Sequence, residues 1–142
     1  MTALDIAREL VKDHEGCRLH PYTDTVGKVT IGYGRNLDDR GVTLAEATAM
    51  LDHDLGVAKA DAKSWLGESC WEELSDVRKA VLIDLSFNLG RSRLRGFVQL
   101  KKALHIGKYS KAADEMLDSR WAGQVGVRAV RLASIMRTGL EG

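Results

Sequence analysis

The sequence is poor in the residues that mark several special classes of protein. It has one proline and two cysteines among 142 residues, and aromatic residues make up 6%. A single proline excludes a proline-rich linker, and 14 glycines without a regular period exclude collagen. Cys17 and Cys70 do not form a CxxC pair, so we expect two free thiols rather than a disulfide framework or a zinc site.

Long hydrophobic runs and a large net charge are also absent. No apolar run approaches the ~20 residues that a membrane span needs, and the charged residues 1–12 do not resemble a signal peptide. We therefore expect a cytoplasmic chain without stable membrane insertion. The 21 Lys and Arg against 20 Asp and Glu give a net charge of +1, which argues against a dedicated nucleic-acid-binding protein.

The nearly neutral total divides unevenly along the chain. Residues 1–66 carry 8 basic and 11 acidic side chains, whereas residues 67–142 carry 13 basic and 9 acidic ones. The net charges are therefore −3 and +4. Two interpretations stay open, an unevenly charged solvated surface or an acidic half for chemistry beside a basic half that holds an anionic substrate.

The first 42 residues predict a helix followed by a small antiparallel sheet. Thr2 and Asp5 have capping-box spacing, and Gly16 is a typical helix stop, so Glu15 falls in or just after the last helical turn. Strands are expected over residues 17–23 and 28–33, with turns at residues 24–27 and 38–41.

The rest of the chain predicts helices only. Thr43 and Glu46 form a capping box that opens a helix within residues 43–66, and 22 continuous helical residues would span about 33 Å at 1.5 Å per residue. That length is sufficient to bridge two lobes. Further helices are expected from residue 75 to Gly90, where the apolar pattern marks a buried central helix, and over residues 96–106, 110–119 and 127–137.

These elements predict an α+β fold within one domain over residues 1–142. A small N-terminal β-lobe at about residues 13–42 would be joined by the long helix, residues 43–66, to a helical C-terminal lobe at residues 67–142.

Two carboxylates occupy positions with different electrostatic surroundings. Glu15 lies at the end of the first helix, where the negative end of the helix dipole disfavours an ionised carboxyl group. Asp24 lies in an exposed turn, where water and backbone N–H groups can contact a charged carboxylate. Glycoside hydrolysis uses such a pair, and the Thr30 hydroxyl on the next strand can orient a water. From placement alone, an ordinary helix-terminal Glu and an ordinary turn Asp remain the better explanation.

The local sequence around these residues resembles the signature of phage-type lysozymes, glycoside hydrolase family 24. The segment from Glu15 to Gly34 follows the long pattern E-G-x5-Y-x-D-x2-G-x2-T-I-G-Y-G. The resemblance continues in order through Arg78-Lys79-Ala80, Phe87-Asn88-Leu89-Gly90, Gly96-Phe97, Ser119-Arg120-Trp121 and Arg137-Thr138-Gly139.

The resemblance implies a lysozyme-like fold and an endolysin, a muramidase that hydrolyses the β-1,4 bond between N-acetylmuramic acid and N-acetylglucosamine. By the matching motif, Glu15 would be the general acid, Asp24 would stabilise positive charge on the sugar ring, and Thr30 would hydrogen-bond the attacking water. The family's inverting mechanism corresponds to carboxyl groups roughly 6.5–9.5 Å apart. No cofactor or metal is implied, and the four histidines form no H-x-x-x-H or E-x-x-H cluster.

The same resemblance suggests where the substrate binds. Asn88 would hydrogen-bond an acetamido group and Phe87 would support the cleft wall, while Arg120 and Arg128 are candidates for binding stem-peptide carboxylates. The ordinary alternatives are that Asn88 only ends a helix and that Arg128 lies on a solvated helix face. The tryptophans are expected to pack rather than to stack on sugars: Trp65, Trp71 and Trp121.

Arg35 is a departure from the family pattern, which often has His after T-I-G-x-G. Because Arg stays charged at all relevant pH values, an ion pair at Arg35 should not switch near neutral pH. The short segment 35–42 before the long helix leaves the depth of the cleft and the number of sugar subsites open.

The expected partner is the peptidoglycan glycan strand, and we expect a monomer that binds no nucleic acid. The chain would accumulate in the host bacterial cytoplasm and reach the wall with the help of a holin-type membrane protein. The alternatives are a lysozyme-fold module that binds peptidoglycan without cutting it, a helical nucleic-acid-binding protein that uses the basic half, and a toxin or tail-associated enzyme.

Overall fold

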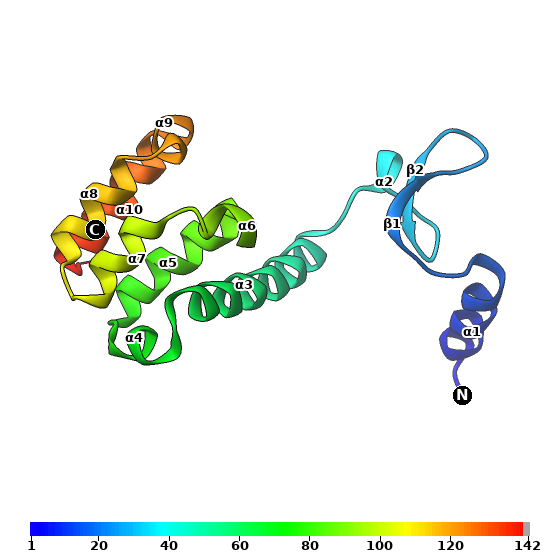
Figure 1. The fold of residues 1–142 in the computed structure, drawn as a ribbon. Coiled ribbons are helices and arrows are strands. Elements are labelled where there is room, and N and C mark those ends of the chain that lie inside the picture. Colours follow the sequence, from blue (N-terminus) through cyan, green and yellow to red (C-terminus); the bar gives the residue numbers. More distant parts are fainter. Residues whose placement is uncertain (141–142) are drawn as a thin grey trace. The chain divides into compact units, whose positions relative to one another are not determined.

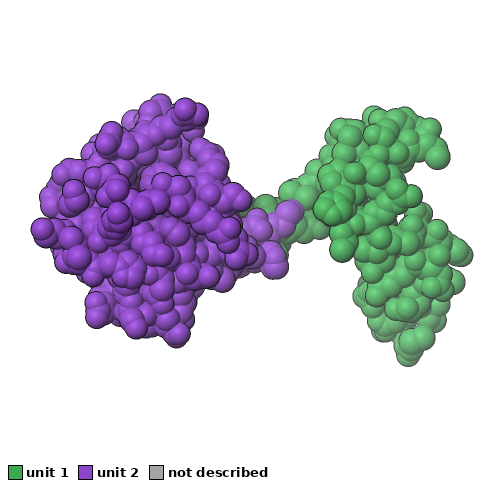
Figure 2. Space-filling view, in the orientation of Figure 1, with its two compact units in different colours: residues 1–49 green, residues 50–142 purple. Residues whose placement is uncertain are grey.

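The computed structural model describes residues 1–140 and divides into two compact units, residues 1–49 and 50–142 (Figure 2). The division falls within the long helix α3 (Leu44–Leu66), which spans 23 residues. Its predicted capping box is confirmed, because Glu46 N–H donates to Thr43 Oγ1 at 3.1 Å and Thr43 N–H donates to Glu46 Oε1 at 2.8 Å. The single domain over residues 1–142 stays a prediction.

The first helix of the chain, α1 (Ala3–Glu15), begins and ends where the sequence predicts. Asp5 N–H donates to Thr2 Oγ1 at 3.1 Å, and Thr2 N–H donates to the Asp5 carboxylate at 3.0 Å. Gly16 closes the helix with a φ of 68°, and its N–H donates to Lys12 O at 3.0 Å. The C-terminal stop therefore leaves Glu15 as the last helical residue.

The sheet of the first unit has three antiparallel strands in the order β1 (Arg18–Thr23), β2 (Val29–Gly32) and β3 (Arg35–Asn36) (Figure 1). Thr30 lies on the middle strand, opposite Tyr22 on one side and Asn36 on the other. Of residues 1–49, all of which the structure describes, only Thr30 is buried, with 3% of its surface exposed.

The turn predicted over residues 38–41 is wrong, since this segment forms the one-turn helix α2 (Leu37–Arg40). The Asn36 side chain caps it by accepting a hydrogen bond from Asp39 N–H at 3.0 Å, which favours a helical turn over an open one. The acidic residues of α2 hold the beginning of β2: Asp38 accepts from Val29 N–H at 2.7 Å, and Asp39 pairs with Lys28 Nζ at 3.1 Å.

The described part of the second unit contains helices and no strands (Figure 1). After α3, α8 packs against α7 and α10, while α10 also packs against α5 and α9. The bounds are α4 (Glu68–Glu73), α5 (Asp76–Leu89), α6 (Arg91–Leu94), α7 (Val98–His105), α8 (Tyr109–Leu117), α9 (Arg120–Val125) and α10 (Val127–Thr138).

The hydrophobic core of the second unit gathers around α5, as its continuous apolar pattern predicts. Trp71 and Trp121 are each 2% exposed, which confirms their predicted packing role, and the half-buried Trp65 packs against the same core. The buried residues of α5 are Val81, Leu82, Leu85, Ser86 and Leu89.

Most predicted helix positions in this unit are confirmed, with two kinds of exception. The helix expected over residues 96–106 is shorter, because Gly96 and Phe97 precede its first turn. The short helices α4, α6 and α9 were not predicted, since segments of four to six residues are too short to show an apolar period. No helix among residues 1–140 is long and apolar enough to cross a membrane.

Candidate active site

Glu15 extends from the end of α1 toward the turn that follows β2. A Cβ atom placed on Gly34 would lie 3.2 Å from Glu15 Oε2 and 3.5 Å from its Cδ. Gly34 also has a φ of +87°, a conformation that residues with a Cβ rarely adopt. Position 34 therefore requires glycine for two independent reasons, and one of them is the close approach of the Glu15 carboxyl group.

Asp24 is held by the backbone of its own turn. Its Oδ1 accepts hydrogen bonds from Val26 N–H at 3.0 Å and from Lys28 N–H at 2.8 Å. The predicted contact between this carboxylate and backbone N–H groups is confirmed. These two bonds fix the carboxylate plane, and Oδ2 has no hydrogen-bond partner among residues 1–140.

Thr30 presents an oriented hydroxyl group from the middle strand. Its Oγ1 donates to Lys28 O at 3.0 Å. A hydroxyl has one proton and two acceptor lone pairs, so the donated proton leaves Oγ1 as an acceptor. A water that meets this side chain would therefore donate one of its protons to Thr30.

Lys28 links Asp24 and Thr30 through its main chain. The Lys28 N–H donates to the Asp24 carboxylate, while the Lys28 carbonyl accepts from both Asp24 N–H, at 2.9 Å, and Thr30 Oγ1. The structure thus brings Asp24 and Thr30 together through one residue. Glu15 meets the same sheet at Gly34, and no hydrogen bond joins its side chain to Asp24 or Thr30 within the described residues 1–49.

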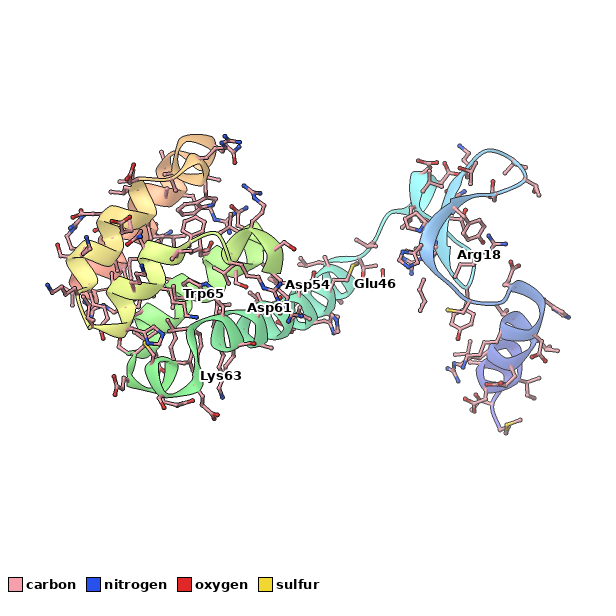
Figure 3. The ribbon with its side chains drawn as sticks, viewed as in Figure 1. Arg18, Glu46, Asp54, Asp61, Lys63 and Trp65 are labelled. Atoms are coloured by element: carbon pink, nitrogen blue, oxygen red, sulfur yellow. The ribbon has the colours of Figure 1, made fainter. Side chains whose placement is uncertain are left out.

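The departure at Arg35 has a clear structural outcome. Its guanidinium forms a two-bonded ion pair with Glu46, with distances of 2.9 Å for Nη1–Oε1 and 2.7 Å for Nη2–Oε2, and Nη1 also donates to Gly41 O at 3.0 Å. Hydrogen bonds from Arg35 and from Thr43 lower the pKa of Glu46 to about 2, and Glu46 in turn raises the pKa of Arg35. The sequence indicated a permanently charged partner at Arg35 but not which acid it binds. The predicted capping box placed Glu46 in the first turn of α3, where Figure 3 labels it, and this was the only sequence feature that pointed to Glu46 as a fixed carboxylate.

Two predicted substrate-binding residues lie at the end of α5. The Asn88 Oδ1 accepts from Trp121 Nε1 at 2.6 Å, so the core fixes this side chain and its amide nitrogen remains a donor. Phe87 is 43% exposed and lines a hollow of about 240 Å³ with residues of α3. Both placements are compatible with sugar binding, and the roles of Asn88 and Phe87 stay predictions.

The two predicted substrate-binding arginines differ in their surroundings. Arg120 is exposed, has no ion pair within the described part of the chain, and lines a hollow of about 550 Å³ that also contains Phe97 and Trp121. Arg128 instead pairs with Asp84 through its Nε at 2.8 Å. Arg120 therefore has no ion-pair partner among residues 1–140, although Glu115 and Asp118 line the same hollow, whereas Arg128 is paired with a carboxylate.

The two thiols are free, as predicted. Cys17 is exposed, and the half-buried Cys70 contacts Leu104 O at 3.6 Å. Burial, with a smaller effect of Glu73, raises the pKa of the Cys70 thiol. Among residues 1–140, no group of three or more His, Cys, Asp or Glu side chains is arranged to hold a metal ion.

Comparisons with known proteins match nearly the whole chain. The model of the phage lysozyme family matches residues 12–136. The probable T4-type lysozyme 1 of Dictyostelium discoideum is 28% identical, and the match covers 93% of this chain and 94% of that protein. The endolysin of Acyrthosiphon pisum secondary endosymbiont phage 1 is 31% identical over 80% of this chain and 75% of that protein.

A third relative is a much larger protein. The pre-baseplate central spike protein Gp5 of Enterobacteria phage T4 is 27% identical over 92% of this chain, but the match covers only 27% of Gp5. The region of similarity thus occurs both in proteins of about this length and as one part of a longer one.

Proposed function

Since the chain belongs to the phage lysozyme family and is a lysozyme-type glycoside hydrolase, we propose that it cleaves the β-1,4 bond between N-acetylmuramic acid and N-acetylglucosamine in peptidoglycan. One observation carries the proposal. Glu15, Asp24 and Thr30 occupy one unit, where Gly34 leaves room for the Glu15 carboxyl and Lys28 holds the other two side chains. The family match includes all of these positions.

Glu15 is the proposed general acid. Its carboxyl group is exposed to solvent at the end of α1, next to a backbone turn that carries no side chain at position 34. A glycosidic oxygen can therefore approach the carboxyl group without a competing side chain from that turn. Protonation of this oxygen makes the leaving sugar a neutral alcohol, which lowers the barrier to bond cleavage.

Asp24 and Thr30 are the proposed partners of the water and of the developing positive charge. Asp24 keeps one oxygen on two backbone N–H groups and leaves the other without a partner among residues 1–140, so this second oxygen can accept a proton from water or face an oxocarbenium-like sugar ring. Thr30 accepts a hydrogen bond from the same water through a lone pair of Oγ1. Attack by this water on the face opposite the leaving group would invert the anomeric carbon.

The substitution Glu15→Gln tests this assignment because it keeps the size of the side chain and removes the transferable proton. The variant should fold like the wild-type chain and lose at least about 10²-fold in the rate of new reducing ends from purified peptidoglycan. Glu9→Gln is the matched control, an exposed glutamate on the same helix that should keep full activity. Substantial cleavage by Glu15→Gln would reject the general-acid role.

The stereochemistry is a separate measurement. Inversion predicts that the first product released is the α-anomer, which NMR of the anomeric protons can follow before mutarotation. An initial β-anomer would mean retention and would assign Asp24 a different role. Binding to purified walls without any new reducing ends would instead support the alternative of a non-catalytic peptidoglycan-binding module.

Residues of the second unit are also proposed to bind parts of the substrate. The Asn88 amide nitrogen is positioned to donate to an acetamido carbonyl, since its Oδ1 is occupied by Trp121. Phe87 supports a sugar ring, and the unpaired Arg120 is the better candidate of the two arginines for a stem-peptide carboxylate. Arg128 would first have to leave Asp84.

The biological setting proposed is lysis of a bacterial host. The chain would act as a monomer, accumulate in the host cytoplasm and reach peptidoglycan after a holin-type protein permeabilises the membrane. Similarity to the Dictyostelium lysozyme and the phage endolysin over most of their lengths supports a free enzyme. The similarity to Gp5 keeps a tail-associated role as the alternative, which isolation of the chain from intact virions would support.

A further inference from the structure

A small hollow of about 230 Å³ lies on the second unit, formed by α3 and the segment that runs from α6 to α7. Figure 3 shows Asp61 and Trp65 on one side of α3 and Lys63 on the other. None of the lining residues is a proposed catalytic or substrate-binding residue, and Asp61 also lines the hollow beside Phe87. The lining residues are Asp61, Ser64, Trp65, Arg91, Arg95 and Lys101, and we refer to this hollow as the cationic pocket.

Three cations and one carboxylate, Asp61, line the cationic pocket, so positive charge is in excess there. Arg91 and Arg95 are four residues apart, a spacing that places like charges side by side and costs stability. Arg93, which lies between them, turns elsewhere and donates to Gln124 Oε1 at 3.1 Å. Within residues 1–140, neither Arg91, Arg95 nor the half-buried Lys101 has an ion-pair partner within 4.0 Å.

Several other cations of this unit are paired with carboxylates, which the three cations of the pocket are not in the described part of the chain. Lys63 contacts Glu68 and Glu72, and Lys79 contacts the other oxygen of Glu72. Arg128 pairs with Asp84, and Arg137 pairs with Asp114. The lining of the cationic pocket thus contains three cations against the single carboxylate of Asp61. Such a cluster favours a multiply charged oxyanion, because guanidinium forks and an ammonium group supply several charge-assisted hydrogen bonds.

The other three lining residues favour a ligand that also has neutral hydroxyl groups over a free inorganic anion. Asp61 would repel a free phosphate ion, but its carboxylate can accept hydrogen bonds from neutral hydroxyl groups, as can the Ser64 hydroxyl. The partly exposed Trp65 indole offers a flat apolar surface of the kind that covers the C–H face of a sugar ring. A ligand with a phosphate at one end and hydroxyl groups at the other would satisfy all six side chains.

We propose that the cationic pocket binds a phosphorylated sugar, with the phosphate on Arg91, Arg95 and Lys101 and the sugar ring against Trp65. The small size of the hollow favours a single phosphorylated residue, of the kind that anionic cell-surface glycans carry. This binding is separate from glycan cleavage, because no residue of the pocket takes part in the proposed reaction.

The test is a titration of the intact chain with glucose 1-phosphate, inorganic phosphate and glucose at constant ionic strength. The readout is the ¹⁵N–¹H signal of the Trp65 indole, assigned by its disappearance in Trp65→Phe. Glucose 1-phosphate should shift this signal in a saturable manner and bind at least about tenfold more tightly than either of the other two probes. Equal affinity for inorganic phosphate would overturn the sugar part of the proposal, and the absence of a saturable shift would overturn the site.

Charge-removing variants distinguish binding in the cationic pocket from non-specific attraction of anions to the positively charged surface. Arg91→Gln and Arg95→Gln change exposed side chains, and each should weaken glucose 1-phosphate binding about tenfold. Lys102→Gln removes the same charge from the residue next to Lys101 but outside the pocket, so it should change the affinity less than twofold. Equal weakening by all three variants would show that only the overall positive charge matters and would contradict the proposal.

Discussion

The contact between Glu15 and Gly34 can be tested by adding one methyl group. In Gly34→Ala the new Cβ would stand 3.2 Å from Glu15 Oε2, closer than carbon and oxygen atoms normally approach, so the carboxyl group must move by a few tenths of an ångström. Alanine at a φ of +87° also costs about 1–2 kcal/mol of unfolding free energy. The variant should therefore lose stability and displace the proposed acid at the same time.

Gly32→Ala separates these two effects. Gly32 has a φ of +70°, and a Cβ placed there meets no other atom within 4 Å. Both variants should lower the melting temperature by roughly 3–10 °C, because both place alanine in a strained backbone conformation. Only Gly34→Ala moves the Glu15 carboxyl. Since a 1 Å misplacement can cost about 10²-fold in rate, a few tenths of an ångström should cost roughly three- to tenfold beyond the control.

The assay is the initial rate of reducing-end release from purified peptidoglycan, measured well below both melting temperatures so that both variants are folded. Gly34→Ala should be slower than Gly32→Ala at matched stability. Equal rates would refute this expectation, because they would show that the close approach of the Glu15 carboxyl to position 34 has no part in catalysis.

Three further perturbations follow from the described contacts. Thr30→Val should cost about 1 kcal/mol of unfolding free energy and most of the wall-cleaving activity, while Thr30→Ser keeps both; full activity in Thr30→Val would contradict the role of the hydroxyl. The pKa of Glu46 is about 2, so its pair with Arg35 should stabilise the fold above pH 4.5 and be lost as the pH falls from there toward 2; Glu46→Gln should flatten that part of an acid denaturation curve. Trp121→Phe removes the donor to Asn88, and a loss of about 1 kcal/mol in urea denaturation together with weaker binding of chitin-type oligosaccharides is expected.

The helix boundaries were predictable where one residue supplies both the signal and the hydrogen bond. Thr2 and Thr43 cap their helices through their own hydroxyl groups, and Gly16 and Gly90 end theirs with positive φ values. These interactions are local, so the sequence contains all the atoms that form them. The short helix α6 lacks such a signal, because no side chain caps it.

The candidate site was predictable in its residues but not in its contacts. The hydrogen bonds from the N–H groups of Val26 and Lys28 to the Asp24 carboxylate are of a type that the sequence predicts. An Asp in a tight turn commonly accepts from backbone N–H groups two to four residues further along the chain. The approach of Glu15 to Gly34 joins positions 19 residues apart, and the Arg35–Glu46 pair joins positions 11 residues apart. The partner of such a side chain depends on how distant parts of the chain are brought together in the fold. The spacing of residues in the sequence does not determine this.

The uneven charge of the two halves also has a more specific meaning in the structure. Arg128 and Arg137 contribute to the positive half, but each is paired with a carboxylate of its own unit. The charge available to an anionic ligand is therefore concentrated at fewer positions, among them Arg120 and the cationic pocket.

Lys28 contacts the proposed catalytic side chains only through its main-chain N–H and carbonyl groups. Its N–H orients one proposed catalytic side chain, and its carbonyl receives the proton of another. A pattern written in residue types treats this position as unrestricted, although the Lys28 side chain also pairs with Asp39 outside the catalytic residues. Proline alone would break the arrangement, because it has no N–H to offer. Lys28→Pro should therefore disable the site more severely than Lys28→Ala, although a pattern search would accept both changes. The side chains of Asp24 and Thr30 are thus coupled through main-chain hydrogen bonds of Lys28, which a list of catalytic side chains does not include.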